Sequence, residues 1–443
     1  MKNISDLHKI FIIGGGAGGL ELATKLGHKL GKKKKAEITL VDCNRTHIWK
    51  PLLHEVAAGS LDSSDDEVSY MAHAHWNNFN FRLGRMDSLN REKREISLAP
   101  TLDDEGNEYI PRRNFNYDTL VIAVGSITNH FDIPGVEEHC KFLDTRDEAD
   151  RFHQYLLRKY TAAHTQKEPL REGQLHIAIA GAGATGVELS AELYEASKQL
   201  VKFGLSNISA ERDVKITIIE AADKILPALP DRISNKTVAA LAKLNIEVMT
   251  GQRVNKATNE GFYTESGKFI PSEIKVWAAG IKAPDFLSNI DGLETSRNNQ
   301  LVVKTTLQTT WDDNIFAFGD CAACPMPGTN GIVPPRAQAA HQQASLLVKS
   351  MKKRLAGKPL PDYRYVDYGS LVNLSRYSTV GSLMGNLAGK ISGNVMIEGI
   401  IARLVYESLY KMHQLAINGP MRVFLSAIAD VLTRKAKPRM KLH

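Results

Sequence analysis

A glycine-rich turn between an apolar run and a helical pattern occurs twice in this 443-residue chain. The first copy has the form G-x-G-x-x-G at Gly14, Gly16 and Gly19. In such a unit the first glycine permits a tight turn, the second lets a pyrophosphate approach the backbone, and the third lets helix and strand pack closely. Asp42 ends the next apolar run, where a carboxylate can accept hydrogen bonds from a ribose. This segment therefore predicts a Rossmann-like dinucleotide site.

The second copy follows the same plan. Its glycines are Gly181, Gly183 and Gly186, and the acid at the end of its second apolar run is Glu220. The interval to this acid is longer than usual, and the polar stretch 198–213 predicts an extended helix and an insertion. Two such units in one chain predict an α/β fold with two bound dinucleotides, which is more specific than either motif alone.

Further apolar runs close each unit. One ends at Ala123 and Gly125, another ends at Gly280, and a third ends at Gly319-Asp320. In this order the chain resembles the two-dinucleotide-binding flavoprotein reductases. The resemblance implies that the first unit holds FAD, that the second holds NAD(P)H, and that Asp320 lies on the ribityl chain of the flavin.

The acid of the second unit indicates which nicotinamide is used. A carboxylate at Glu220 would accept hydrogen bonds from a ribose 2′-hydroxyl and would repel a 2′-phosphate. The residues that follow are Ala221, Ala222 and Asp223, so no arginine stands there to bind that phosphate. The sequence therefore predicts NADH rather than NADPH.

The cysteines narrow the choice of electron acceptor. A disulfide reductase of this superfamily needs a cysteine pair against the flavin, but Cys43 and Cys140 each stand alone in the segments where such a pair would lie. The Cys321-x-x-Cys324 pair could be redox-active or supply half of a tetrahedral metal site, but its apolar neighbours favour small packing residues. No metal site is predicted, and His73 and His75 are interpreted as surface residues.

A polar helix start lies further along the chain. Gln338 and His341 are three residues apart and share one helical face, with Gln342 beside them. This segment resembles the Ala-Gln-x-Ala-x-Gln helix start of type II NADH:quinone oxidoreductases, except that Gln343 replaces a glycine found in many members. The resemblance implies that this helix lines a quinone pocket beside the flavin, where an amide and an imidazole can donate to quinone oxygens. A helix turn with polar capping side chains is the simpler alternative.

Two more segments resemble the same family. Residues 49–55, which include Lys50, correspond to a segment that passes near the isoalloxazine ring, and Glu188 corresponds to a glutamate near the nicotinamide–flavin contact. A carboxylate in the first turn of a helix is also favoured by the helix dipole whatever its function. The resemblance implies hydride transfer from NADH to FAD, two-electron reduction of a membrane quinone, no proton pumping, and a homodimer.

The C-terminal tail carries nearly all of the net charge. Residues 401–443 hold eight basic and two acidic side chains, and the whole chain has a formal charge of +7. Two amphipathic helices are expected there, separated by Gly419-Pro420, after a glycine-rich stretch 381–393 that favours loops or a hairpin. An apolar face with a basic rim is typical of a helix that lies on an anionic membrane surface. No recognised nucleic-acid-binding module accompanies the charge, so nucleic acid is not an expected partner.

These inferences give a predicted domain plan. Residues 1–145 form the first part of an FAD-binding domain, 146–285 an inserted NADH-binding domain, 286–380 the second FAD part with the quinone site, and 381–443 a membrane-association region. No run is long and apolar enough to span a bilayer. The resemblance and the basic tail together imply a peripheral protein on the cytoplasmic face of a bacterial inner membrane. A soluble reductase of an iron–sulfur partner and a non-catalytic redox sensor remain alternatives.

Overall fold

The computed structural model of the chain describes residues 7–433, except residues 63–66, 104, 376–377 and 385–393. The chain forms two compact units, each assembled from three stretches of sequence. Unit 1 comprises Met1–Trp49, Glu67–Ile127 and Ile281–Asp367, and unit 2 comprises Lys50–Asp66, Thr128–Gly280 and Tyr368–His443. The longest stretch of unit 2 is therefore inserted between two stretches of unit 1, as expected for one dinucleotide-binding fold nested in another.

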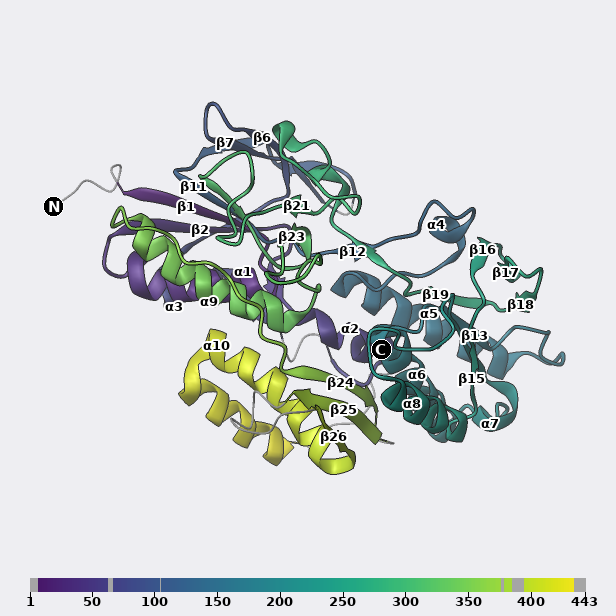
Figure 1. Ribbon diagram of the computed structural model, residues 1–443. Coiled ribbons are helices and arrows are strands. Elements are labelled where there is room, and N and C mark those ends of the chain that lie inside the picture. Colours follow the sequence, from purple (N-terminus) through teal and green to yellow (C-terminus); the bar gives the residue numbers. More distant parts are fainter. Residues whose placement is uncertain (1–6, 63–66, 104, 376–377, 385–393, 434–443) are drawn as a thin grey trace. The chain divides into compact units, whose positions relative to one another are not determined.

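A five-stranded parallel sheet forms the centre of unit 1 (Figure 1). Its order is β22 (Ile315–Ala317), β11 (Thr119–Ile122), β1 (His8–Ile13), β2 (Ala36–Asp42) and β5 (Asn80–Leu83). The central strands are continuous apolar runs because helices and loops cover both faces of a parallel sheet. Helices α1 (Ala17–Leu26) and α9 (Ala337–Arg354) pack against each other beside this sheet.

Shorter elements complete unit 1. The antiparallel sheet β10-β7-β6 is formed by Arg113–Asn116, Glu95–Leu98 and Met86–Asn90. The remaining elements are η2 (Gly27–Gly31), β3 (Thr46–His47), β4 (Val68–Ser69), α3 (Tyr70–Asn77), β8 (Thr101–Leu102), β9 (Glu108–Ile110), β20 (Ile281–Lys282), η4 (Asp285–Leu287), η5 (Ile290–Gly292), β21 (Leu301–Val302), η6 (Gly319–Cys321) and β23 (Ala322–Ala323). Strand β12 (Ile127–Thr128) lies where the chain passes into unit 2.

Unit 2 contains a second parallel sheet. Its order is β15 (Ile246–Met249), β14 (Lys215–Ile219), β13 (His176–Ala180) and β19 (Ile274–Trp277). The helices of this unit are η3 (Lys50–Leu52), α2 (Leu53–Ala58), α4 (Val136–His139), α5 (Arg146–Thr165), α6 (Ala184–Lys202), α7 (Ala210–Asp213) and α8 (Asp231–Lys243). A capping box between Thr145 and Glu148 fixes the start of α5. The end of α6 at Lys202 and the separate helix α7 confirm the extended helix and insertion predicted for 198–213.

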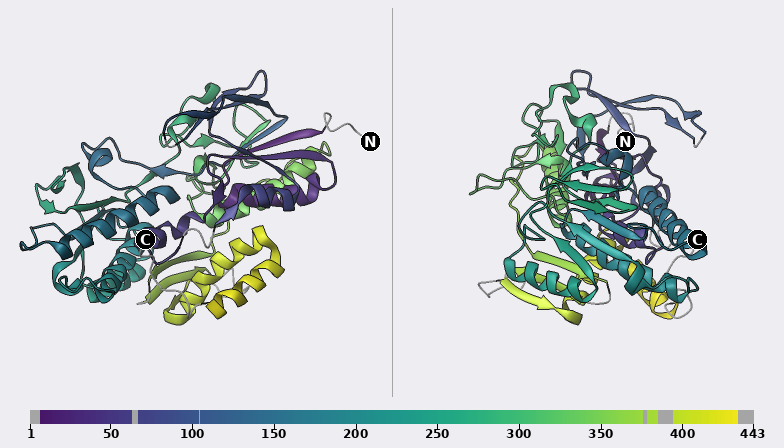
Figure 2. Two further views of the ribbon diagram at one scale, coloured as in Figure 1. Left: turned by 180° about the vertical axis from the view of Figure 1, so that it is seen from behind. Right: turned by 90° about the vertical axis from the view of Figure 1, so that its right-hand side faces the viewer.

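Two small antiparallel sheets and a long helix complete unit 2. Strands β16 (Val254–Ala257), β17 (Gly261–Thr264) and β18 (Phe269–Pro271) form one sheet. Strands β24 (Gly369–Leu374), β25 (Ser378–Met384) and β26 (Asn394–Glu398) form the other, and α10 (Gly399–Thr433) packs beside it (Figure 2). The β25–β26 pairing agrees with the expected glycine-rich hairpin, although residues 385–393 lie outside the described part. The backbone of α10 leaves the helical region at Gly419, with φ of 76°, which divides it into the two predicted helices.

None of the described helices is both long and apolar enough to cross a membrane.

The prediction that His73 is a surface residue is wrong. Its side chain is fully buried, and its Nε2 lies 2.8 Å from the hydroxyl of Thr24, whereas His75 is exposed. The ring is buried because α3 turns this residue toward α1, which residue type alone does not indicate. The functional boundaries at residues 145, 285 and 380 stay a prediction.

Both glycine turns require a residue without a Cβ atom at the third glycine of the motif. A Cβ atom on Gly19 would overlap the carbonyl oxygen of Gly14, and a Cβ atom on Gly186 would overlap that of Gly181. By contrast, a Cβ atom on Gly16 or Gly183 would meet no described atom within 4 Å. The third glycine of each motif is thus required for packing inside the chain, while the second faces open space.

We expect the substitution Gly186→Ala to destabilise unit 2, because the added methyl group collides with the backbone of Gly181. The cost should be about 1–3 kcal/mol, which is typical of overpacking. Thermal unfolding followed by circular dichroism checks this, with Gly183→Ala as the matched control that should unfold at the wild-type temperature. Equal unfolding temperatures for the two variants would contradict this packing account.

Candidate functional site

The first glycine turn of unit 1 is held by hydrogen bonds to its neighbouring strand. The N–H of Gly14 donates to the carbonyl of Val41 at 2.8 Å, and the N–H of Gly15 donates to Oδ2 of Asp42 at 2.6 Å. Burial raises the pKa of Asp42 above its ordinary value, while the backbone N–H groups of Asn44 and Gly15 lower it. Asp42 thus fixes the turn as well as ending the strand where a ribose hydroxyl would bind.

The N-terminus of α1 is open to an anion. Gly16 occupies the N-cap position, and no side chain in the described part of the chain caps this helix. The free N–H groups of a first helical turn, together with the helix dipole, favour a phosphate group. The turn at Gly14, Gly16 and Gly19 therefore fits the pyrophosphate of FAD.

The Gly-Asp segment after β22 lies in the same unit and is also held in place. Oδ2 of Asp320 accepts from the hydroxyl of Ser126 at 3.0 Å, and its carbonyl oxygen accepts from Nε2 of Gln300 at 3.0 Å. The preceding N–H, at Gly319, donates to Oε1 of the buried Gln343 at 2.8 Å. These contacts orient the Asp320 carboxylate, which fits the predicted role on the ribityl chain.

Strand β11 is followed by Ala123 and Gly125, where the sequence predicts the end of an apolar run. The N–H of Ala123 donates to the carbonyl of Ile13 at 2.7 Å, and Gly125 follows with φ of +70°. A Cβ atom on Gly125 would meet no described atom within 4 Å. The backbone therefore leaves room at this turn, as an FAD site at the end of the parallel strands requires.

The glycine turn of unit 2 has the same construction. The N–H of Gly181 donates to the carbonyl of Ile219 at 2.7 Å, and the N–H of Ala182 donates to Oε2 of Glu220 at 2.7 Å. The other oxygen of Glu220 accepts from the N–H of Ala222 at 2.9 Å. Gly183 is the N-cap of α6, which likewise has no capping side chain among the described residues. These residues fit the pyrophosphate and ribose of NADH.

Two further predicted cofactor residues also lie in unit 2. Gly280 has φ of +69°, and its carbonyl oxygen accepts from the N–H of Asn129 at 3.2 Å. Nζ of Lys50 lies 3.1 Å from Oδ1 of Asp144, whose Oδ2 accepts from the N–H of Thr128. Lys50 is therefore tied to the segment that leads into α5.

Glu188 is a buried carboxyl group near the start of α6. Its Oε1 accepts from the N–H of Asn373 at 2.9 Å, and the residue is 7% exposed. Burial raises the pKa of Glu188 to about 8, the hydrogen bond from Asn373 opposes this, and the nearby carboxylates Glu55 and Glu192 add to it. The raised pKa favours the protonated form of Glu188 at neutral pH, whereas a helix dipole would favour the ionised form.

The polar start of α9 is only partly available to a ligand. Gln338 donates from Nε2 to Oδ1 of Asp367 at 3.2 Å, and Nδ1 of His341 lies 2.5 Å from Oε2 of Glu21. The amide of Gln342 bonds to both backbone groups of Val366: its Nε2 donates to the carbonyl at 2.7 Å and its Oε1 accepts from the N–H at 3.1 Å. Gln342 therefore fastens the segment before β24, whereas the side chain of His341 is 45% exposed.

The cysteine pair near Asp320 does not have the environment of an activated thiol. All four cysteines are free, and Cys321 and Cys324 are buried. Burial raises the pKa of each of these two thiols to about 12, which disfavours the reactive thiolate. Within the described ranges, no three potential metal ligands of the His, Cys, Asp and Glu types lie together.

Sequence reasoning missed two residues of this region. Glu21 lies within the helix that follows the first glycine turn, and it is only 1% exposed although it is an acidic residue. Gln343 stands out only as a departure from the family pattern, and its contact with Gly319 supplies a reason for it. Both contacts join segments about 20 or more residues apart, so no local pattern reveals them.

The raised pKa of Glu188 predicts a pH-dependent stability. Between about pH 5 and pH 8 the folded chain keeps a proton that the unfolded chain releases, so the free energy of unfolding should fall as pH rises. In Glu188→Gln this contribution is absent, and its stability relative to wild type should rise by up to about 1.4 kcal/mol per pH unit in that window.

Denaturant unfolding at several pH values measures this difference. Glu211→Gln, at an exposed side chain of the same unit, is the control and should follow the wild-type pH profile. A Glu188→Gln profile parallel to wild type would show that Glu188 is already ionised at neutral pH.

Comparisons with known proteins agree with this geometry. The pyridine nucleotide-disulphide oxidoreductase family matches residues 8–344. A type II NADH:quinone oxidoreductase of Haemophilus influenzae is 42% identical, with 99% of this chain and 100% of that protein covered. One of Staphylococcus aureus is 29% identical over 87% of this chain and 92% of its own length.

Solved structures match the fold. The structure of NDH2 from Plasmodium falciparum in complex with NADH superimposes with a TM-score of 0.80 at 21% identity, covering 98% of this chain and 100% of that one. The sulfide:quinone oxidoreductase of Aquifex aeolicus gives a TM-score of 0.71 at 16% identity, with 96% and 95% covered. The chain belongs to the pyridine nucleotide-disulphide oxidoreductase family and, within it, to the type II NADH:quinone oxidoreductases.

Proposed function

We propose that this chain is a single-subunit respiratory NADH dehydrogenase that does not pump protons and that reduces a membrane quinone. The observation that carries this proposal is the full-length similarity to a protein named for NADH:quinone oxidoreduction. The two glycine turns, each with an open helix N-terminus, support it because they fit two dinucleotides. When bound, FAD supplies a ring that accepts a hydride and gives up two electrons.

Unit 1 supplies the residues proposed to hold FAD. Its backbone N–H groups at the start of α1 bind the pyrophosphate, Asp42 accepts from the ribose, and Asp320 accepts from the ribityl hydroxyls. The N–H groups of a helix start and two fixed carboxylates place the flavin without requiring a proton transfer from the protein. The proposed FAD contacts of unit 1 are Gly14, Gly16, Gly19, Asp42, Ala123, Gly125 and Asp320. Lys50 belongs to unit 2 and stays a predicted cofactor contact.

Unit 2 supplies the residues proposed to bind NADH, which are Gly181, Gly183, Gly186, Glu220 and Gly280. The start of α6 binds the pyrophosphate, and Glu220 accepts hydrogen bonds from the 2′-hydroxyl. Glu188 is buried and has a raised pKa, and it is proposed to lie beside the nicotinamide ring. Alignment of donor and acceptor, rather than acid–base chemistry, governs hydride transfer.

Gln338 and His341 are the residues proposed to contact the quinone. An amide and an imidazole can donate to quinone carbonyl oxygens, and both side chains belong to the helix that packs against α1. The helix also passes close to Asp320. A Cβ atom built on Gly319, the residue before Asp320, would lie 3.6 Å from the Cβ of Ala340, which stands between Gln338 and His341. Gln342 has a supporting role because both ends of its amide are bonded to Val366.

The function and the nicotinamide preference are tested together by steady-state oxidation of NADH and NADPH with a short-chain quinone. Wild type should turn over with quinone and prefer NADH. Glu220→Gln keeps an oxygen for the N–H of Ala182 but removes the negative charge, so its preference for NADH should fall by about tenfold or more. Glu247→Gln, at an acid of the neighbouring strand β15, is the control and should keep the wild-type preference.

Three results would contradict these assignments. An unchanged preference in Glu220→Gln would remove Glu220 from the ribose site. Wild-type turnover with an iron–sulfur protein but not with quinone would favour a soluble reductase, and negligible turnover with every acceptor would favour a redox sensor.

The second half of α10 supports association with a membrane surface. Met421, Phe424, Leu425 and Ile428 are 44–70% exposed and lie at helical spacing. Arg422 is exposed beside them, and the basic run 434–441 follows outside the described residues. An exposed apolar face with basic residues near it fits an anionic leaflet. We infer a peripheral protein on the cytoplasmic face of a bacterial inner membrane, and a homodimer from the family resemblance.

The double substitution Phe424→Gln and Leu425→Gln should weaken binding to vesicles that contain anionic lipid, because it removes exposed apolar surface from this face. Cosedimentation should show at least about a tenfold loss of affinity. The control carries Met71→Gln and Trp311→Gln, which are equally exposed elsewhere and should bind like wild type. Equal binding by both double variants would exclude this face as the membrane contact.

A further inference from the structure

Helix α1 buries a carboxylate that the cofactor site does not use. Glu21 is the one acidic residue of α1, and its side chain is 1% exposed among apolar neighbours of the helix. An ionised carboxylate is costly to bury unless cations or hydrogen-bond donors surround it. Its partners therefore show what the position requires.

Both oxygens of Glu21 have a partner within unit 1. Oε1 lies 2.5 Å from Nζ of Lys25, one helical turn further along α1. Oε2 lies 2.5 Å from Nδ1 of His341 on α9. Lys25 also donates to the hydroxyl of Ser345 at 3.1 Å, so the pair of helices is joined through two polar contacts.

The contact with Glu21 fixes the direction of the His341 ring. Because a carboxylate oxygen can only accept, Nδ1 of His341 carries the hydrogen, and Nε2 points away from Glu21. The ring is 45% exposed, whereas the carboxylate behind it is buried. This is the arrangement in which a carboxylate orients an imidazole.

We propose that Glu21 is a positioning residue that makes His341 the donor of the solvent proton in quinone reduction. The inference rests on the proposed function. NADH gives a hydride, which carries two electrons and one proton, and a quinone takes two electrons and two protons to become a quinol. The Nε2–H bond of the His341 imidazolium breaks, an O–H bond forms on the quinone, and the neutral imidazole regains a proton from water.

A purely structural role for Glu21 leads to different expectations. If the carboxylate only joined α1 to α9, its loss would lower stability and flavin content, and quinone and NADH steps would suffer alike. If it orients His341, the loss falls on the step that needs a proton at the quinone. The two roles are therefore separated by comparing the two half-reactions.

The kinetic test uses Glu21→Gln, which keeps the shape of the side chain but removes its charge. We expect kcat with a short-chain quinone to fall by roughly tenfold or more, since positioned acid catalysis contributes at least this much. The rate of flavin bleaching by NADH and the KM for NADH should stay within about twofold of wild type, a change too small to mark loss of a binding contact. Glu21→Asp retains a carboxylate and should recover part of the lost kcat.

A spectroscopic test reads the ring directly, in protein without NADH or quinone. Nitrogen-15 NMR of labelled histidine, recorded at a pH high enough for imidazole rings to be neutral, should show the hydrogen of His341 on Nδ1. In Glu21→Leu, which lacks an acceptor, the hydrogen should move to Nε2, the preferred position in an unconstrained imidazole. A merely structural contact through Lys25 would leave the hydrogen position unchanged.

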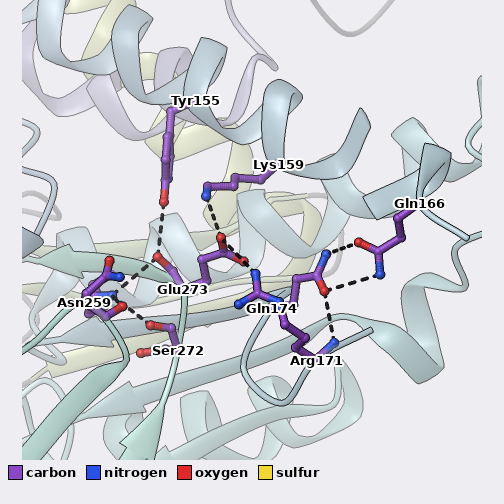
Figure 3. Close-up of polar contacts among 9 residues, drawn as sticks. Tyr155, Lys159, Gln166, Arg171, Gln174, Asn259, Ser272 and Glu273 are labelled. Atoms are coloured by element: carbon purple, nitrogen blue, oxygen red, sulfur yellow. Dashed lines mark hydrogen bonds and ion pairs between the residues drawn. The ribbon is translucent and has the colours of Figure 1, made fainter. Parts of the chain in front are cut away.

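The control is another carboxylate paired with a lysine. Oε1 of Glu273 lies 2.6 Å from Nζ of Lys159 and 3.8 Å from Nη2 of Arg171 (Figure 3). Glu273→Gln breaks an ion pair of similar length in unit 2 and should keep the wild-type kcat with quinone.

The possible results distinguish a failure of the proposed function from a failure of the role proposed for Glu21. Wild-type protein without quinone turnover overturns the proposed function. Normal wild-type turnover together with an unchanged kcat in Glu21→Gln, or a wild-type His341 with its hydrogen on Nε2, overturns the inference alone.

Discussion

The hydrogen bond from a glycine-turn N–H to the carboxylate of the next strand is the constraint on which both glycine turns depend. Asp42 holds Gly15 in unit 1, and Glu220 holds Ala182 in unit 2. Each contact keeps the turn at the edge of a parallel sheet, so that the following helix starts with its N–H groups free. The same acid thus fixes the backbone and has lone pairs left that could accept from the ribose hydroxyls of the proposed cofactor.

Much of this could be predicted from the sequence because the interactions are local. The strand, turn, helix and acid of each unit follow one another within a short segment, and the break in α10 follows from Gly419-Pro420. The contacts that were missed or wrong depend on packing between distant segments. His73 is turned inward against Thr24, and Gln343 reaches Gly319. Neither residue type nor spacing contains that information.

The polar side chains at the start of α9 have contacts that the sequence motif does not predict. The motif predicts three polar side chains for a quinone, but the structure gives them different tasks. Gln342 is bonded to the backbone of Val366, Gln338 contacts Asp367, and His341 is oriented by Glu21. Two of the buried acids also have different surroundings. Burial and nearby carboxylates raise the pKa of Glu188, whereas Glu21 has Lys25 and His341 on its two oxygens.

The central claim is that electrons pass from NADH through the bound flavin to a quinone, and a two-stage anaerobic stopped-flow experiment tests it most directly. The purified flavoprotein is mixed first with one equivalent of NADH and then with a short-chain quinone, while the flavin absorbance is recorded. The account predicts that the absorbance is lost in the first stage and returns in the second at least as fast as steady-state turnover. A flavin that NADH reduces but that quinone does not reoxidise would contradict it.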